Sequence, residues 1–197
     1  RNKAEQIGNV SFFTKKIETR WYSQGLLHRE NGPAIDYKSE DGSIIKKKWY
    51  KRGKLQKEEE YISGHSQITN TTKKWYNENG KLTRKYERCK IGSIEEWYNK
   101  NGGLTRKYER GKTGRIEEWY NENGELHRKL GPALNKTNEY GTMVRKEWYQ
   151  KGKLHRTGKP ALYKYNENLK IFTEEWYQYG KLHRTGNPAL RKYRFLK

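Results

Sequence analysis

The stretch EEWYNENGELHRKLGPAL, from Glu117 to Leu134, joins a Trp-Tyr pair, a glycine turn, a His-Arg pair and a Gly-Pro-Ala corner. Taken alone, it suggests an active-site loop with His127 as a base and Arg128 as an anion clamp. Trp-Tyr pairs recur along the chain, however, and they account for all seven tryptophans: Trp21, Trp49, Trp75, Trp97, Trp119, Trp148 and Trp176. The stretch is therefore one unit of a repeat and not a single site.

The residues after each Trp-Tyr pair come in a constant order. Every pair is followed by a glycine and, two residues after that glycine, by a leucine. Four of the five histidines come directly after that leucine: His28, His127, His155 and His183. All four prolines stand five residues beyond those histidines, and each precedes an alanine. Successive tryptophans are 28, 26, 22, 22, 29 and 28 residues apart, and periods of this size are typical of a repeat architecture. The longer units, of about 28 residues, hold the Leu-His-Arg group and the Pro-Ala corner, whereas the shorter units in the middle of the chain have 22 residues and lack this corner.

Composition gives two opposing indications. The 197 residues carry a net charge of +21, 34% of them are charged and only 31 are Leu, Ile, Val or Phe, which is typical of disordered chains. Disordered chains are poor in aromatic residues, however, and this chain has 14% at regular spacing. Because Trp and Tyr each bury about 150–250 Å², stacked aromatics can replace an aliphatic core. The composition favours one elongated array of short units without a dividing linker.

The stretch IFTEEWYQYGKLHR at 171–184 shows how each unit folds. Phe172, Glu174 and Trp176 alternate with residues of the other face, as in a strand, and QYGK predicts a tight turn. In NENG at 77–80 and 121–124, the Asn-Gly pair supplies residues that tolerate a positive φ. A short Leu-His-Arg strand and a Pro-Ala corner follow, and PALYKY at 160–165 starts the next strand.

The predicted fold is therefore all-β: an elongated, single-layer antiparallel ribbon, or solenoid, of about seven stacked β-hairpins. The tryptophans should line up as one structural ladder, because hairpins that cannot bury their own aromatics bury them against neighbouring units. Residues 1–20 read as an irregular lead-in, 21–190 as the repeat array, and RKYRFLK at 191–197 as a basic strand that is not closed into a hairpin. Bare edge strands favour pairing with another chain, which predicts an oligomer or assembly through the terminal strands.

The segment WYNENGKLTRKYERCKIGSIEEWYNKNG, from Trp75 to Gly102, resembles the variant MORN repeat, in which an aromatic-Tyr pair precedes Asn-Gly-x-Leu. The LHR-x-x-GPA form is similar to the longer repeat that is abundant in large DNA viruses of protists. The resemblance covers about residues 20–190 and implies a scaffold or binding surface without catalytic residues. The chain departs from the pattern where Asn would precede Gly, and once where His or Thr is expected: Gln24, Arg52, Lys151, Tyr179 and Gln56.

Catalytic, metal and cofactor sites are not expected. Each histidine of the Leu-His-Arg group stands in a separate unit without metal-ligand spacing, and Thr83 and Thr105 occupy the same slot in the middle units. The Glu-Glu pairs, such as 117–118, place their carboxylates on opposite faces of a strand. The lone cysteine, Cys89, excludes an intramolecular disulfide and favours a reducing intracellular compartment. No apolar run in the sequence is long enough to cross a bilayer.

A cation occupies one slot of every unit, either lysine or arginine: Arg29, Lys57, Arg84, Arg106, Arg128, Arg156 and Arg184. With strands about 4.8 Å apart, these cations recur about every 10 Å along one edge. Such a row could follow a polyanion, or each cation could pair with a glutamate of the next strand; both interpretations stay open. Residues 148–197 hold 12 Lys and Arg against 3 Asp and Glu, so the predicted binding surface includes Arg191, Lys192 and Arg194.

Three functions follow from these observations. The first is a non-enzymatic scaffold that binds proteins with acidic surfaces, such as a minor virion component that cements a major coat protein. The second is a nucleic-acid-binding protein, which the charge favours, although the sequence has none of the usual nucleic-acid motifs. The third, implied by the resemblance alone, is a protein neutraliser of the antitoxin kind. The cytoplasm or a virion is the expected location.

Overall fold

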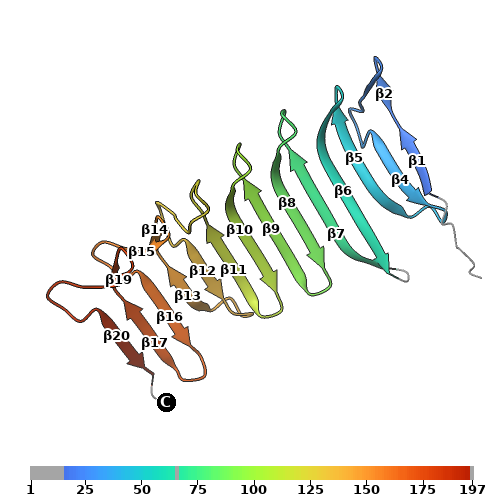
Figure 1. Cartoon of the computed structure of the whole chain (residues 1–197). Coiled ribbons are helices and arrows are strands. Elements are labelled where there is room, and N and C mark those ends of the chain that lie inside the picture. Colours follow the sequence, from blue (N-terminus) through green and yellow to red (C-terminus); the bar gives the residue numbers. More distant parts are fainter. Residues whose placement is uncertain (1–15, 65–66, 196–197) are drawn as a thin grey trace, which may run out of the picture.

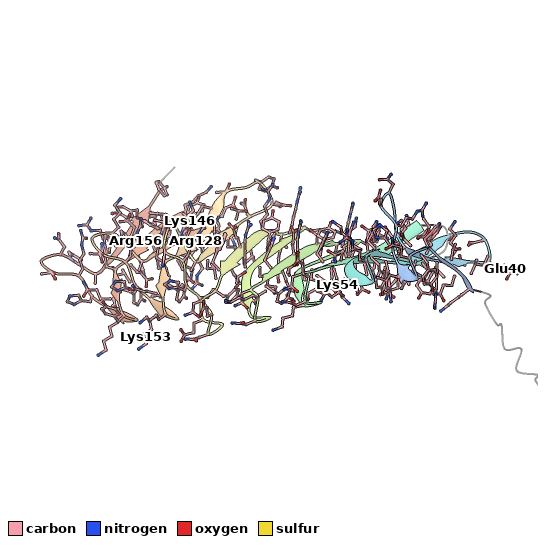
Figure 2. All side chains as sticks on the ribbon, turned by 90° about the horizontal axis from the view of Figure 1, so that it is seen from above. Glu40, Lys54, Arg128, Lys146, Lys153 and Arg156 are labelled. Carbon is pink, nitrogen blue, oxygen red and sulfur yellow. The ribbon has the colours of Figure 1, made fainter. Side chains whose placement is uncertain are left out.

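The computed structural model describes residues 16–64 and 67–195, in which every regular element is a β-strand and no helix occurs. Fourteen strands form one open antiparallel sheet, and each strand pairs only with its neighbours in the order of the chain. The ribbon is long and one layer thick (Figure 1), and side chains project from both of its faces when it is seen from above (Figure 2). The predicted single-layer ribbon is confirmed, with seven tryptophan units that contribute two strands each.

The main sheet consists, in spatial order, of β1 (Lys16–Arg20), β4 (Ile35–Ser39), β5 (Ile44–Lys51), β6 (Lys54–Gly64), β7 (Gln67–Tyr76), β8 (Leu82–Cys89), β9 (Gly92–Tyr98), β10 (Leu104–Gly111), β11 (Gly114–Trp119), β12 (Leu134–Thr137), β13 (Met143–Glu147), β16 (Leu162–Asn166), β17 (Ile171–Glu175) and β20 (Leu190–Arg194). Three small two-stranded sheets lie at the tips of the longer units: β2 (Tyr22–Ser23) with β3 (Leu26–Leu27), β14 (Tyr149–Gln150) with β15 (Lys153–Leu154), and β18 (Tyr177–Gln178) with β19 (Lys181–Leu182).

Strand β1 departs from the prediction for the N-terminal segment. Residues 16–20 belong to the expected irregular lead-in, yet they pair in register with β4 along their whole length. The reason is that β4 would otherwise be the edge strand of the sheet, and Lys16–Arg20 pairs with its outward-facing backbone groups. The rest of the expected lead-in, residues 1–15, lies outside the described residues. At the other end, β20 pairs with β17, and residues 196–197 of the predicted terminal strand also lie outside the described residues.

The tips of the shorter units are closed by an asparagine side chain. At the tip of the β9–β10 hairpin, Gly102 N donates to Asn99 O at 3.0 Å, and Asn99 Oδ1 accepts from the backbone N of Asn101 and Gly103. The same set of bonds is made by Asn77 at the tip of the shorter β7–β8 unit, by Asn121 at the tip of the longer β11–β12 unit, and by Asn138 in the turn that joins β12 to β13. The prediction of a positive φ in NENG holds only for the glycine, because the asparagine before it is not among the residues with positive φ.

The tips of four other hairpins are tighter two-residue turns in which both residues have a positive φ. The first of the two is the residue at which the sequence departs from Asn-Gly: Gln24, Arg52, Lys151 and Tyr179, with φ between 49° and 52°. This conformation costs roughly 1–2 kcal/mol for a side chain other than glycine. The departures from the repeat pattern therefore leave the turn intact but strain it.

The Pro-Ala corner returns the chain from the tip into the main sheet. In the β13–β16 unit, Trp148 N donates to Ala161 O at 2.8 Å, and Ala161 N donates to Glu175 O at 2.9 Å. Ala161 is fully buried, as are Ala34 and Ala133 in the equivalent corners. The expected Leu-His-Arg strand is shorter than predicted, because β15 ends at its leucine. A small residue is required here since the backbone of the corner lies against strands on both sides.

Buried apolar side chains are few and spread along the ribbon. Among the described residues, the buried apolar side chains are Ala34, Ile35, Ala133, Ala161, Leu162 and Trp176. They come from four different units, so the described part of the molecule has no central core. Each unit is stabilised by contact with its two neighbours, as expected for a repeat array.

Candidate functional site

The tryptophans and the repeated cations oppose each other across neighbouring strands. Arg106 on β10 is the register partner of Trp97 on β9 and of Trp119 on β11. Its guanidinium carbon lies 4.5 Å and 4.7 Å from the centroids of these two rings, which is within the range of a cation–π interaction. Lys57 and Arg84 hold the same position between their tryptophans. We call the resulting row the tryptophan–cation ladder: Trp49, Lys57, Trp75, Arg84, Trp97, Arg106 and Trp119.

In the longer units, the arginine stacks on the tryptophan of its own repeat. Arg156 lies 3.9 Å over the ring of Trp148, and its Nη1 donates to the carbonyl of Pro160 at 3.2 Å. The same pair of contacts, with a ring and with a proline carbonyl, holds Arg29, Arg128 and Arg184. Figure 2 shows Arg128 and Arg156 on the same side of the ribbon as Lys146. We call this side the ladder face.

Glutamates neutralise the middle of the ladder. Arg106 binds Glu117 of the neighbouring strand, with 2.6 Å between Nη2 and Oε1, and Arg84 binds Glu95 in the same way. Lys57 pairs instead with Glu59 of its own strand at 2.6 Å. The pairing of the repeated cation with a glutamate of the next strand is thus present at Arg84 and Arg106. The sequence did not indicate the stacking on tryptophan, which is common to the whole slot.

Aromatic rings continue the ladder face toward the C-terminus. Trp148 meets Tyr163 edge to face at 5.5 Å between centroids, Tyr163 stacks on Phe172 at 5.8 Å, and Phe172 lies 6.1 Å from Tyr193 on β20. Arg191 lies 5.4 Å over Trp176. Of the predicted basic residues in β20, Arg191 therefore belongs to the ladder face, whereas Lys192 and Arg194 are exposed.

The histidines join consecutive tips. His28, His127 and His155 each accept a hydrogen bond through Nδ1 from the backbone N of the first turn residue of the next unit, at 3.3 Å. His155 also stacks on Tyr179, with 4.3 Å between ring centroids. In the shorter units, the threonines of this slot bond to the carbonyl of the preceding tryptophan. The slot therefore makes structural contacts within the array.

Tyrosines and glutamates bond to each other on the side opposite the ladder, which we call the reverse face. Tyr98 Oη donates to Glu96 at 2.8 Å, and burial together with this bond raises the pKa of Tyr98 to about 12. The same bond to a glutamate two residues earlier is made by Tyr120, Tyr149 and Tyr177. Sequence reasoning missed these pairs, although the spacing Glu-Trp-Tyr places the first and third residue on one strand face.

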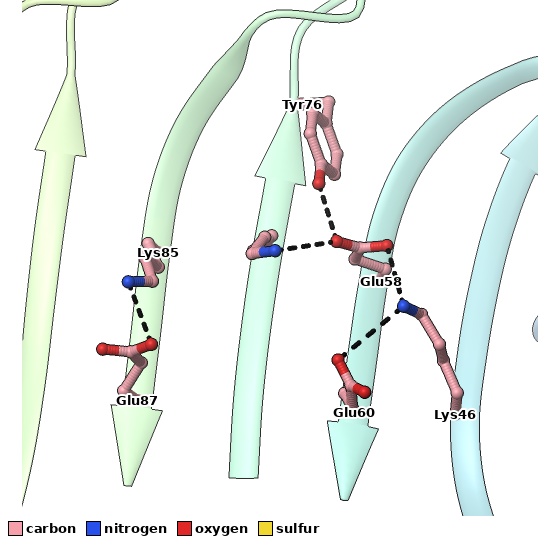
Figure 3. A network of polar contacts seen from close by, with 7 residues as sticks. Lys46, Glu58, Glu60, Tyr76, Lys85 and Glu87 are labelled. Carbon is pink, nitrogen blue, oxygen red and sulfur yellow. Dashed lines mark hydrogen bonds and ion pairs between the residues drawn. The ribbon is translucent and has the colours of Figure 1, made fainter.

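Lysines and glutamates extend the reverse face into a network of ion pairs. Lys46 contacts Glu58 at 3.8 Å and Glu60 at 3.7 Å, Tyr76 donates to Glu58 at 2.8 Å, and Lys85 binds Glu87 at 2.9 Å (Figure 3). Each of these glutamates contacts at least one lysine, so most charges of this region are locally balanced.

Glu59 on β6 is the most perturbed carboxylate of the ladder face. Its side chain is nearly buried, which by itself would raise its pKa. Hydrogen bonds and ion pairs from Lys57, Tyr61 and Lys73 outweigh that burial and lower the pKa to about 2. The site is a stabilising contact between β6 and β7, because all four side chains lie in one cluster and the cations satisfy the carboxylate.

A groove with a volume of about 490 Å³ lies on the reverse face, near the turns that join β8 to β9 and β10 to β11. Ile94, Ile116 and Cys89 line it, and Gly92 and Gly114 leave room in its floor. A Cβ at Gly92 or Gly114 would lie 2.2 Å or 2.0 Å from a backbone carbonyl, so these strands approach more closely than any other residue type permits. The groove is open and mainly apolar.

In the part of the chain that the structure describes, no three His, Cys, Asp or Glu side chains form a cluster that could hold a metal ion. No helix there is long and apolar enough to cross a membrane. Cys89 is a free, exposed thiol. The chain was also compared with known proteins, and neither a protein-family model nor a curated protein matches it.

Proposed function

We propose that the chain is a non-enzymatic repeat scaffold of the variant MORN type, which holds protein partners on the faces and edge of its ribbon. The observation that supports this most directly is the tryptophan–cation ladder. The repeated His, Arg, Trp and Glu side chains contact one another, so the residues that could serve chemistry are engaged in building the array. What remains available to a partner is a long surface with charges at regular spacing.

The partner class follows from the free cations at the C-terminal corner. Lys170 and Arg194 are exposed there, and the backbone bond from Phe195 N to Lys170 O at 3.0 Å ties the end of β20 to the turn that holds Lys170. Neither side chain takes part in an ion pair with any residue that the structure describes. A protein with an acidic surface is the complementary partner, and the edge of β20 can add main-chain hydrogen bonds to it. A coat protein of a virion and a small protein toxin are both partners of this kind.

Partner capture from cells that express the chain tests the proposal. We expect an acidic protein to co-purify, and the double variant Lys170→Gln/Arg194→Gln to retain less of it than wild type. The variant Lys38→Gln/Lys51→Gln is the matched control, since it removes two exposed cations at the other end of the ribbon. Equal capture by all three proteins would show that the C-terminal corner is not the contact surface.

Binding of nucleic acid is a second candidate function, favoured by one specific observation. Lys136, Lys164 and Lys192 are exposed on the reverse face, on β12, β16 and β20, and no described residue pairs with them. A row of this kind could follow a phosphate backbone. Titration of a labelled oligonucleotide at several salt concentrations would separate the two functions. For contacts with phosphates, the logarithm of the association constant falls with the logarithm of the salt concentration, with a slope of about −0.7 to −0.9 for each cation involved.

A further inference from the structure

One row of cross-strand partners on the reverse face changes from negative to positive charge at its midpoint. Successive register partners connect Glu60 on β6 to Lys192 on β20, and on every second strand the residue in this row is charged. We call these six residues the charge row, in spatial order along the sheet: Glu60, Glu87, Glu109, Lys136, Lys164 and Lys192. Three carboxylates are followed by three ammonium groups, about 10 Å apart because two strand spacings separate them.

The signs of the charge row are complementary to those of a second copy of the row that runs in the opposite direction. A two-fold axis parallel to the strands and above β11 would place β10 over β12, β8 over β16 and β6 over β20 of a second copy. Each glutamate would then face a lysine: Glu109 faces Lys136, Glu87 faces Lys164 and Glu60 faces Lys192. Such an interface would be isologous, as a closed dimer requires. It would contain six ion pairs, since each of the three pairs would occur twice.

The lysine half of the charge row lacks partners in the single chain. Lys136, Lys164 and Lys192 form no ion pair with the described residues, and all three are exposed. The glutamate half is less satisfied than its contacts suggest. Glu60, Glu87 and Glu109 keep 51%, 43% and 34% of their side-chain surface exposed, although each binds one lysine, which for Glu109 is Lys107. Both halves can therefore take a further charge from outside.

The two-fold axis would pass through the apolar groove. Ile116 on β11 lies in the same register row, between Glu109 and Lys136, and it would face itself across the axis. Ile94 and Ile91 beside it are 36% and 65% exposed. Pairing of the two copies would cover this groove, and burial of apolar surface contributes about 25 cal/mol per Å².

The two rows of the reverse face that would meet in such a contact are close to neutral. Two neighbouring rows on this face hold ten cations and nine carboxylates. The cations are Arg20, Lys46, Lys48, Lys74, Lys85, Lys107, Lys136, Arg145, Lys164 and Lys192, and the carboxylates are Glu18, Glu58, Glu60, Glu87, Glu96, Glu109, Glu118, Glu147 and Glu175. The excess of positive charge lies almost entirely elsewhere.

We propose that the reverse face pairs with the reverse face of a second copy, through the charge row and the groove that interrupts it. This proposal rests on the scaffold function and names one partner of the scaffold, namely the chain itself. Two twisted sheets pack about 10 Å apart with their strands about 30° from parallel. The two partners are therefore closer to each other in the inner ion pairs, Glu109 with Lys136 and Glu87 with Lys164, than in the outer pair, Glu60 with Lys192.

Charge reversal tests the pairing on the full-length protein. Sedimentation velocity should show a dimer of the wild type at an ionic strength of about 0.15 M, where the Debye length of about 8 Å screens the excess charge elsewhere on the two copies, and weaker association at about 1 M, where it is about 3 Å. The triple variants Glu60→Lys/Glu87→Lys/Glu109→Lys and Lys136→Glu/Lys164→Glu/Lys192→Glu should each lower the association constant at least about tenfold. The combined six-fold variant, which has the original net charge and the reversed row, should dimerise again.

A control variant separates the charge row from net charge. Lys38→Glu/Lys51→Glu/Lys100→Glu changes the net charge as the lysine triple variant does, at exposed positions outside the row, and it should still dimerise. Far-UV circular dichroism checks that each variant keeps its strand content. Failure of the six-fold variant to associate, when both triple variants are monomeric, would overturn the proposal.

A second measurement leaves the charges unchanged. In a Cys89→Ser background, Ile116→Cys should be crosslinked to its own copy by a short bismaleimide. Ile94→Cys should react much less, since its copy would lie four strands away, about 19 Å. Equal crosslinking at both positions would contradict the two-fold axis. A monomeric wild type that still captures an acidic protein would overturn the self-pairing alone, whereas a dimer that captures no partner would count against the wider scaffold function.

Discussion

Arg106 and Trp119 are direct partners across strands β10 and β11, and the guanidinium carbon of Arg106 lies 4.7 Å from the centroid of the Trp119 ring. Arg128 lies 4.1 Å from the same ring. Trp119 is therefore held between two guanidinium groups from different segments. Contacts of this kind join neighbouring units of a ribbon that has no central core, and they let a chain rich in charge and poor in aliphatic residues fold.

Truncation of a central ladder tryptophan should be more costly than truncation of a terminal one. We expect Trp119→Ala to lower the free energy of unfolding by about 3 kcal/mol, because a large side chain with neighbours on both sides is removed. Trp21→Ala should cost less, since Arg29 is the one cation over its ring among the described residues and the end of a repeat array frays. Chemical denaturation followed by far-UV circular dichroism measures both. Equal losses would indicate one cooperative core.

A histidine at a tip should stabilise the fold only where the next unit supplies a backbone N that donates a hydrogen bond to its Nδ1. His127→Leu removes the acceptor of Lys151 N, and we expect a loss of about 0.5–1.5 kcal/mol. His183→Leu is the matched control, because no described backbone N donates to His183 Nδ1. Thermal unfolding of the two variants compares them. A larger loss for His183→Leu would argue against the role of the histidine in joining tips.

Relief of backbone strain should stabilise the protein. Lys151 has a φ of 50°, in a region that asparagine adopts more readily than lysine. We expect Lys151→Asn to raise the free energy of unfolding by about 0.5–1 kcal/mol, while its backbone N continues to bond to His127. Lys153→Asn, in strand β15 of the same tip, should give no gain because asparagine is disfavoured in strands.

Acid should destabilise the contact between β6 and β7 through Glu59. Its pKa is lowered to about 2 in the folded chain from an ordinary value of 4.5, so the folded state binds the proton less readily than the unfolded state. The stabilisation is therefore complete above about pH 4.5 and is lost as the pH falls toward 2. Denaturation midpoints measured from pH 6 to pH 2 should fall less steeply for Glu59→Gln than for wild type. Identical slopes would contradict the assignment.

Much of the architecture can be read from the order of residues along the chain. The spacing of Trp-Tyr, Gly and Leu predicts hairpins, their number and an open antiparallel ribbon, because these features depend on local alternation and turn chemistry. The repeat also shows that Arg106 and its equivalents share one position in every unit. The contacts of Arg106 cannot be read from the repeat, because its stacking on Trp97 and Trp119 depends on the register of two separate strand pairs.

The sequence by itself determined the unit of the fold, the two repeat lengths and the residues that recur in each. Only the tertiary structure decided what those residues touch. Register is set by bulges and tip geometry, and partners such as Arg52 and His28 are 24 residues apart, so a shift of one residue would exchange the two faces of a strand. For the same reason, the sign change between Glu109 and Lys136 becomes visible only when β10, β11 and β12 are aligned.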